Sequence, residues 1–218
     1  MSETSRLIDE ALNEARGPVC VTSSFQSECV VLVHMLIATR PHIPVLFLDT
    51  GYHFPETYAY RDRIAAAWNL NLVNLMPKLS VGEQESQFGI LHQSAPDRCC
   101  GIRKVDPLFA ALENFGAWFT GLRREQSKTR AELKPVDEFT LPSGHRLQKI
   151  SPLAAWSTRN VWQYMQSHNI PELPLYQQGY TSIGCEPCTS RPVDPLDPRS
   201  GRWSGKKLEC GIHLQRPA

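Results

Sequence analysis

The sequence predicts an α/β fold built on a doubly wound, mostly parallel sheet. Short β-prone runs alternate with helical stretches through the first half of the chain, and short segments join them. One run, Val45–Leu48, is apolar at every position, as expected for an interior strand that is covered on both faces. The chain has 218 residues, which is enough to bury a hydrophobic core.

Each element is expected from its own pattern. Residues 1–16 mix charged residues with leucine, isoleucine and alanine, which indicates an amphipathic helix rather than a signal peptide. Strands are expected at residues 19–22, 45–48, 70–75 and 117–120, and helices at residues 28–39, 56–68, 104–113 and 158–168. Residues 139–150, with a Pro-Ser-Gly turn at their centre, predict a hairpin. Ser157 or Thr158 is expected to cap the last helix.

Charge and composition argue against several classes of protein. The formal net charge is +1, so no global field favours nucleic acid or an anionic membrane, and no apolar run is long enough to span a bilayer. We therefore expect a cytoplasmic protein whose thiols stay reduced. Beyond residue 188, prolines are frequent and six basic residues stand against three acidic ones. We expect an α/β domain over residues 1–188 and a C-terminal tail over residues 189–218 that lies over the domain or moves.

Two polar segments follow predicted strands and are candidates for ligand binding. Residues 23–28, Ser-Ser-Phe-Gln-Ser-Glu, open a helix, where hydroxyls and backbone N–H groups can bind an anion. Residues 48–57, LDTGYHFPET, follow the next strand, and their Asp and Thr can bind a ribose or an adenine. Both lie at the carboxyl edge of the sheet, where open α/β sheets bind ligands. A helix cap and a turn before a proline would explain the same residues without a ligand.

The cysteines predict a second site. Of seven, Cys20 and Cys29 lie in apolar stretches and are expected in the core. An adjacent pair and a CxxC pair supply four soft ligands, enough for zinc or an iron–sulfur cluster: Cys99, Cys100, Cys185 and Cys188. The alternatives are a thioredoxin-like redox pair beside two unrelated thiols, or four buried structural thiols.

Basic residues stand near strand ends and near the cysteines. Arginine offers forked donors that suit sulfate and phosphate oxygens, although each residue taken singly could be a solvated surface charge. The candidates are Lys104, Arg123, Arg124, Arg199 and Arg202, with Gly121 opening the Gly-Leu-Arg-Arg run. Cys210 lies in the segment KKLECGIH at residues 206–213, where basic neighbours favour the thiolate. Its alternative is an inert, exposed thiol.

Together these segments resemble the sulfonucleotide reductases, the adenylyl-sulfate and phosphoadenylyl-sulfate reductases of sulfate assimilation. The likeness runs from about Val19 to His213 and is most specific in LDTG-Y-x-FPET and in the final ECGIH. It implies a nucleotide-binding fold of the PP-loop type. Because the four cysteines are similar to those of the cluster-binding branch, it also implies a [4Fe–4S] cluster and adenylyl sulfate as substrate.

The resemblance further implies that Cys210 is the nucleophile and forms an S-sulfonate, from which thioredoxin or a similar dithiol releases sulfite. Phosphosulfate would be bound by Lys104, Arg123 or Arg124, Arg199, Arg202 and His213. Further substrate contacts are expected from Ser23, Ser24, Phe25, Ser27, Glu28, Asp49, Thr50, Gly51 and Gly121. Because relatives associate, a homo-oligomer is expected. The charge and composition given above predict a cytoplasmic protein that binds neither nucleic acid nor membrane. The alternatives are a phosphoadenylyl-sulfate reductase, an ATP-using tRNA-thiolation enzyme of the PP-loop type, and a zinc-stabilised binding domain.

Overall fold

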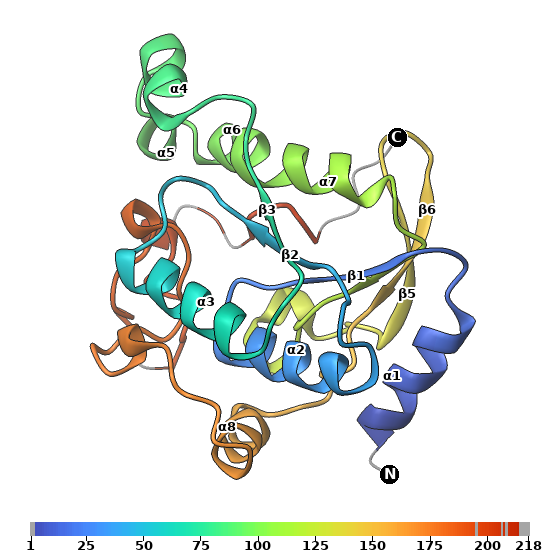
Figure 1. The fold of residues 1–218 in the computed structure, drawn as a ribbon. Coiled ribbons are helices and arrows are strands. Elements are labelled where there is room, and N and C mark those ends of the chain that lie inside the picture. Colours follow the sequence, from blue (N-terminus) through green and yellow to red (C-terminus); the bar gives the residue numbers. More distant parts are fainter. Residues whose placement is uncertain (1–2, 195, 206, 208, 214–218) are drawn as a thin grey trace.

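The computed structural model describes residues 3–194, 196–205, 207 and 209–213, and a six-stranded sheet runs through its centre (Figure 1). The strands lie in the order β3-β2-β1-β4-β6-β5. Their bounds are β1 Val19–Thr22, β2 Val45–Leu48, β3 Leu72–Leu75, β4 Ala117–Phe119, β5 Val136–Thr140 and β6 Arg146–Ile150. Neighbouring strands pair in parallel except β5, which pairs antiparallel with β6. The predicted fold class and the predicted hairpin are confirmed.

Helices cover both faces of this sheet (Figure 1). They are α1 Glu3–Glu14, α2 Ser27–Thr39, α3 Pro55–Ala67, α4 Val81–Phe88, α5 Leu91–Ser94, α6 Pro96–Cys100, α7 Asp106–Leu112 and α8 Thr158–Ser167. Apolar side chains of α1, α2, α3 and α8 pack on one face, and those of α7 pack on the other. Within the described part of the chain, no helix combines the length and the apolar character needed to cross a membrane.

The central strands supply side chains to two hydrophobic cores in alternation. Val21, Phe47 and Phe119 join the core beneath α2, whereas Cys20 and Trp118 join the core beneath α7. Each of these five side chains is almost fully buried, and burial of one large apolar side chain stabilises the fold by about 1.5–3 kcal/mol. Helix α2 lies between the sheet and α1 and α8, which explains why its sequence is apolar nearly all round.

The strand order places a topological switch point at β1. This strand pairs with β2 on one side and with β4 on the other, and all three are parallel. Ligands of open α/β sheets bind beyond the carboxyl ends of the strands at such a point. We therefore expect a ligand site among the residues that follow Thr22, Leu48 and Phe119.

The region between β3 and β4 differs from expectation. The helix expected at residues 104–113 begins earlier, as a π-helix, η1 (Gly101–Val105), and continues as α7. Short π-helical turns are common at functional sites, and this one carries the buried Arg103 and Lys104. Helices α4, α5 and α6 were not expected, although Ser80 and Glu83 form a capping box that marks the start of α4.

Candidate active site

A cavity of about 530 Å³ lies at the carboxyl ends of β1, β2 and β4. It is lined by the residues that follow β1 and β4, by the start of α2, by the π-helix and by the C-terminal segment. The sequence-predicted residues that line it are Ser23, Ser24, Ser27, Glu28, Lys104, Gly121, Arg123, Arg199, Arg202, Cys210 and His213. Residues up to 190 positions apart in the sequence thus meet at the switch point of the sheet.

The loop after β1 presents its serines to this cavity because Phe25 is buried. Phe25 adopts a left-handed conformation (φ 57°) and packs against Phe47 at 5.8 Å between ring centroids. Gln26 occupies the N-cap position of α2, but its side chain makes no capping hydrogen bond. Instead, its amide nitrogen donates to Ser24 Oγ at 3.0 Å, and its amide oxygen accepts from Ile183 N at 2.8 Å. The hydroxyl of Ser27 is buried and has no hydrogen-bond partner among the described residues. A helix N-terminus with an unpartnered hydroxyl is suited to an anionic group.

Four other predicted contacts lie outside the cavity lining, and Phe25 makes a fifth. Asp49 accepts a hydrogen bond from Tyr58 at 2.6 Å and pairs with Arg61 at 3.8 Å. The Thr50 hydroxyl lies 3.2 Å from Cys185 Sγ, so the turn that includes Gly51 supports the cysteine region. Arg124 is exposed and donates to Leu133 O at 2.9 Å. Of the two neighbouring arginines it is Arg123 that is buried against the cavity.

The cavity is rich in buried cations. Burial opposes a charge on Lys104, but the nearby Cys185, Cys210 and Cys100 outweigh it and raise the pKa of Lys104. Burial lowers the pKa of Arg202, whose guanidinium lies 4.4 Å from the centre of the Trp203 ring. Arg123 is the third buried cation, and one of its Nη atoms lies 3.5 Å from Glu125. Its Nε, like that of Arg202, is buried and has no hydrogen-bond partner among the described residues. Buried guanidinium N–H groups without a partner are suited to an anion.

A glycine makes room for one of these cations. A Cβ atom on Gly184 would lie 2.1 Å from an Arg202 guanidinium nitrogen, so a larger residue would displace this side chain. Sequence reasoning missed Gly184, because one glycine near a CxxC pair reads as an ordinary turn.

Cys210 is half-buried in the cavity wall, and its basic surroundings differ from those expected. Lys207 pairs with Asp97 at 2.6 Å, while Lys206 and Leu208 lie outside the described residues. Burial, together with the charges of Lys149 and two arginines, holds the pKa of His213 well below its ordinary value, so this imidazole is neutral. The cations that interact electrostatically with Cys210 are Lys104, Arg199 and Arg202.

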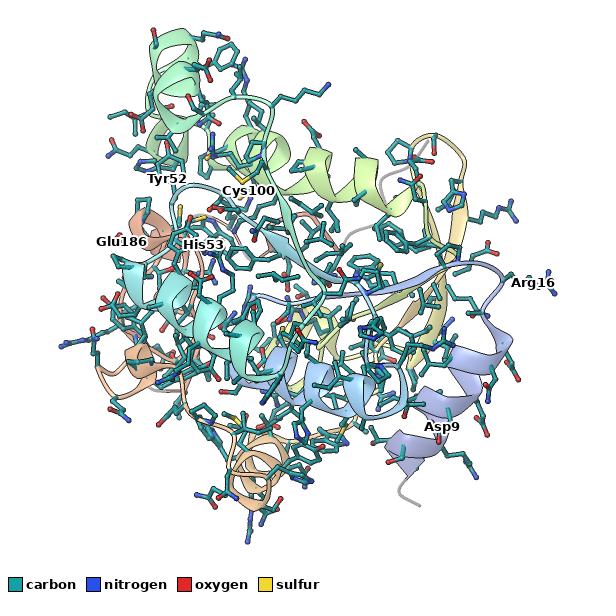
Figure 2. All side chains as sticks on the ribbon, viewed as in Figure 1. Asp9, Arg16, Tyr52, His53, Cys100 and Glu186 are labelled. Atoms are coloured by element: carbon teal, nitrogen blue, oxygen red, sulfur yellow. The ribbon has the colours of Figure 1, made fainter. Side chains whose placement is uncertain are left out.

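The four predicted metal-ligand cysteines meet around a second, small cavity. Cys99 and Cys100 come from α6, and Cys185 and Cys188 come from a loop about 85 positions later. Figure 2 shows Tyr52, His53, Cys100 and Glu186 gathered in the same region of the molecule. Backbone contacts join the loop that carries Cys185 to the turn after β2. Glu186 N donates to Tyr52 O at 2.7 Å, and residues 53 and 185 form a β-bridge.

The donor set of this second cavity suits an iron–sulfur group. All four sulfurs are unpaired thiols, and burial, reinforced by Cys185, raises the pKa of Cys188 to about 11. Thiolates that are packed together repel one another, and a bound metal compensates their charge. Soft sulfur donors are preferred by iron–sulfur clusters and by zinc. Among the described residues, no three Cys, His, Asp or Glu side chains are grouped closely enough to hold a single metal ion.

Several functional candidates were not among the predicted site residues. Arg130 and Gln126 line the main cavity from an irregular polar segment, and Glu209 lines it from the tail. Lys149 lies in β6 beneath the tail, where its Nζ donates to His213 O at 3.0 Å. Polar residues in irregular segments have no periodicity that predicts where they point, so only tertiary structure reveals them.

Comparisons with known proteins agree with this geometry. The model of the phosphoadenosine phosphosulfate reductase domain matches residues 18–191. The adenosine 5'-phosphosulfate reductase of Streptomyces coelicolor is 45% identical over 196 residues, which is 89% of this chain and 81% of that protein. The phosphoadenosine 5'-phosphosulfate reductase of Gloeobacter violaceus is 42% identical over 212 residues, 95% of this chain and 87% of that protein. The crystal structure of phosphoadenylyl-sulfate reductase from Candida auris superposes with a TM-score of 0.75 at 28% identity, covering 87% of this chain and 91% of that one.

Proposed function

The chain belongs to the phosphoadenosine phosphosulfate reductase domain family, and on this premise we propose that it reduces adenylyl sulfate to sulfite and AMP in sulfate assimilation. The observation that carries the proposal is the position of Cys210. Its thiol shares one cavity with the N-terminus of α2 and with buried cations that interact with it. A nucleophile, an anion site and a nucleotide-sized space therefore coincide. The substrate follows from the relatives named adenosine 5'-phosphosulfate reductases.

In the first step the Cys210 thiolate attacks the sulfur of the sulfate group. A bond forms between Cys210 Sγ and this sulfur, and the bond from the sulfur to the bridging phosphate oxygen breaks. AMP leaves with the electron pair of that bond, and the enzyme keeps a cysteine S-sulfonate. Covalent catalysis of this kind divides one difficult substitution into two easier ones.

In the second step a dithiol protein such as thioredoxin resolves the intermediate. One of its thiolates attacks Cys210 Sγ, and sulfite leaves with the electron pair of the sulfur–sulfur bond. The second thiol then displaces Cys210 from the mixed disulfide, so the reductant is oxidised to a disulfide and Cys210 is restored. Such reductants keep thiols reduced in the cytoplasm, where we place the enzyme.

The buried cations supply the electrostatic part of catalysis. Lys104, Arg123 and Arg202 would bind the sulfate and phosphate oxygens, which gain charge as the phosphate leaves. Ser27 and the free end of α2 would hold the phosphate of the nucleotide. Each such donor is already fixed by burial, so little reorganisation accompanies the reaction.

A [4Fe–4S] cluster is the group that best suits Cys99, Cys100, Cys185 and Cys188, and it would supply local charge beside Lys104 rather than electrons for sulfate. Lys104 lines both cavities, so it lies between the cysteines and the nucleotide space. With that group bound, the four cysteines would hold α6 and the π-helix, and with them Lys104, against the loop of residues 183–189.

The test is an anaerobic assay of sulfite release from adenylyl sulfate and from its 3'-phosphorylated form, with thioredoxin as reductant. We expect activity with adenylyl sulfate, and loss of both sulfite release and S-sulfonate formation in Cys210→Ser. Cys20→Ala, which removes a thiol from the core, should stay active. If the Cys210→Ser variant still formed an S-sulfonate on another cysteine, the proposed role of Cys210 would be excluded. A preference for the phosphorylated nucleotide, the substrate in the name of the Gloeobacter relative, would correct the substrate.

A further inference from the structure

The carboxylate next to the nucleophile is held in a dedicated site. Glu209 directly precedes Cys210, and its side chain is only 9% exposed. Arg130 grips it with two nitrogens, Nη2 to Oε2 at 2.7 Å and Nε to Oε1 at 3.0 Å. Thr129 Oγ1 donates to Oε1 at 3.0 Å, and Arg199 lies 3.6 Å from Oε2. A forked arginine contact is among the strongest and most directional hydrogen bonds to a carboxylate.

This carboxylate is an anion in the folded protein. Burial alone would raise the pKa of Glu209, but hydrogen bonds and charge from Arg130, together with the charge of Arg199, lower it. The two oxygens are therefore charged and satisfied at neutral pH. All of these partners except Arg199 come from the segment of residues 127–130, about 80 positions away in the sequence.

A second attachment lies on the other side of Cys210. The backbone oxygen of His213 accepts a hydrogen bond from Lys149 Nζ at 3.0 Å. The His213 ring stacks on Trp118 with 5.4 Å between centroids and 14° between planes. Lys149 and Trp118 belong to β6 and β4, so this end of the tail is fixed to the sheet itself.

Only three residues separate the two attachments, and the chain bends at Gly211. Gly211 has a positive φ of 95°, which a residue with a side chain rarely adopts. Ile212 packs against the core beneath α7. Because each residue spans at most about 3.6 Å, a segment held at both ends leaves the Cys210 thiol little freedom.

The geometry points to Glu209 and Lys149 as positioning residues that hold Cys210 against the nucleotide cavity for attack on the substrate. This inference rests on the proposed function. Two guanidinium nitrogens of Arg130 already donate to Glu209. Arg130 therefore acts through Glu209 rather than on the nucleotide. Lys104 and Arg202, which also line the cavity, remain for the sulfate.

The test compares Glu209→Gln with Glu138→Gln, a matched control. Glu138 pairs with Arg146 at 3.6 Å on the exposed hairpin, with both side chains more than half exposed. Alkylation of Cys210 by iodoacetamide, without nucleotide and resolved by peptide mass spectrometry, measures how freely the thiol leaves its position. The single-turnover rate of S-sulfonate formation at saturating adenylyl sulfate measures positioning, and the KM measures nucleotide binding.

We expect Glu209→Gln to speed alkylation of Cys210 about tenfold and to slow S-sulfonate formation about tenfold, with little change in KM, because one charge-assisted contact is lost. Glu138→Gln should behave as the parent. Lys149→Met should change both rates in the same directions, and it carries the test if Glu209→Gln does not fold.

Equal alkylation rates in Glu209→Gln and the control would show that the contact does not restrain Cys210, and would overturn the inference. Faster alkylation with an unchanged S-sulfonation rate would also overturn it, since restraint would then have no part in positioning. A parent enzyme that never forms the S-sulfonate would instead refute the proposed function, and the positioning role with it. The alkylation rates would still report whether the tail is held, which distinguishes the two failures.

Discussion

Two neighbouring arginines show how a single position decides a role. Arg123 is 7% exposed, lines the cavity and has an Nε without a partner among the described residues. Arg124 is exposed and donates to the carbonyl of Leu133. Extended backbone at Arg123 (φ −133°, ψ 146°) sends successive side chains to opposite sides, which is why two identical residues diverge.

We therefore predict that Arg123→Met lowers the rate of S-sulfonate formation by about 10²-fold, since one fixed donor to a developing oxyanion is typically worth 10²–10³. Arg124→Met should stay within about twofold of the parent. Stopped-flow or quenched single-turnover assays measure both. Because Arg123 also donates to Trp156 O at 3.3 Å, a melting curve must accompany the assay. Equal effects of the two substitutions would contradict the assignment of Arg123 to the cavity.

Lys149 gives a pH dependence whose sign follows from its surroundings. Burial, and secondarily the charge of Arg130, lowers the pKa of Lys149 to about 8. In the unfolded chain a lysine titrates near 10.4. Between these values the unfolded chain binds a proton that the folded chain has released, so the free energy of unfolding rises with pH.

We expect the stability of the parent, relative to Lys149→Met, to increase by up to about 3 kcal/mol between pH 8 and pH 10.5. Urea unfolding of both proteins across this range at matched iron content measures the difference, in which other titrating groups cancel. Two parallel stability curves would show that Lys149 titrates normally.

At the scale of elements, the start of β4 depends on a glycine. A Cβ on Gly116 would lie 2.2 Å from the carbonyl oxygen of Arg16, far inside van der Waals contact. The N–H of Gly116 donates a hydrogen bond to Pro18 O at 2.8 Å, which holds the beginnings of β1 and β4 side by side. A backbone oxygen cannot move aside as a flexible side chain can.

Gly116→Ala should therefore destabilise the protein by about 1–3 kcal/mol, as overpacking of a closed site does. Gly82→Ala is the control: it lies in α4, where a Cβ meets nothing within 4 Å, so this change should be neutral or stabilise by up to about 1 kcal/mol. Chemical denaturation of both variants and the parent measures these changes in the free energy of unfolding. Similar free energies of unfolding for the two would refute the steric argument.

The elements themselves were largely predictable where periodicity was strong. Strands β1 and β2 lie at the predicted positions, and Ser157 caps α8 as expected, with Asn160 completing the capping box. Helices α4, α5 and α6 were missed because they are short, polar and held by tertiary contacts such as Arg103 to Gln84. The π-helical turn at residues 101–105 was not predictable, because no sequence pattern distinguishes its hydrogen bonding from that of an α-helix.

Some residues of the candidate site could be predicted from the sequence and others could not. Motif residues after strands reached the cavity because strand ends converge by topology, as with Ser27 and Gly121. Phe25 was expected among the substrate contacts, and its side chain is buried in the core next to a left-handed backbone. The contact between Arg130 and Glu209 joins two irregular segments, and nothing local to either one encodes it.

At the scale of the whole molecule, the cysteine region and the nucleotide cavity share a wall. Lys104 and Trp203 line both cavities. Three segments far apart in sequence supply most of the cysteine region: residues 48–54, 97–104 and 183–189. Contacts such as Thr50 Oγ1 to Cys185 Sγ at 3.2 Å join them. A bound cluster would cross-link residues 97–104 to residues 183–189, and hydrogen bonds join residues 48–54 to the second of these segments. Loss of the cluster should therefore act on the cohesion of this region rather than on the sheet.

The proposed cross-link can be tested through iron content and hydrogen exchange. Protein purified without oxygen should contain about four irons per chain, as a cubane cluster requires, and Cys188→Ser should lose most of them. Amide hydrogen exchange in residues 48–54, 97–104 and 183–189 should then become at least about tenfold faster, because local opening no longer breaks metal–sulfur bonds. The amides of β4 and β6 should be unaffected, and Cys20→Ala should retain both its iron and its protection. Full iron in Cys188→Ser would exclude Cys188 as a ligand. Uniformly faster exchange through the sheet would instead mean that the four cysteines support the global fold and not this wall alone.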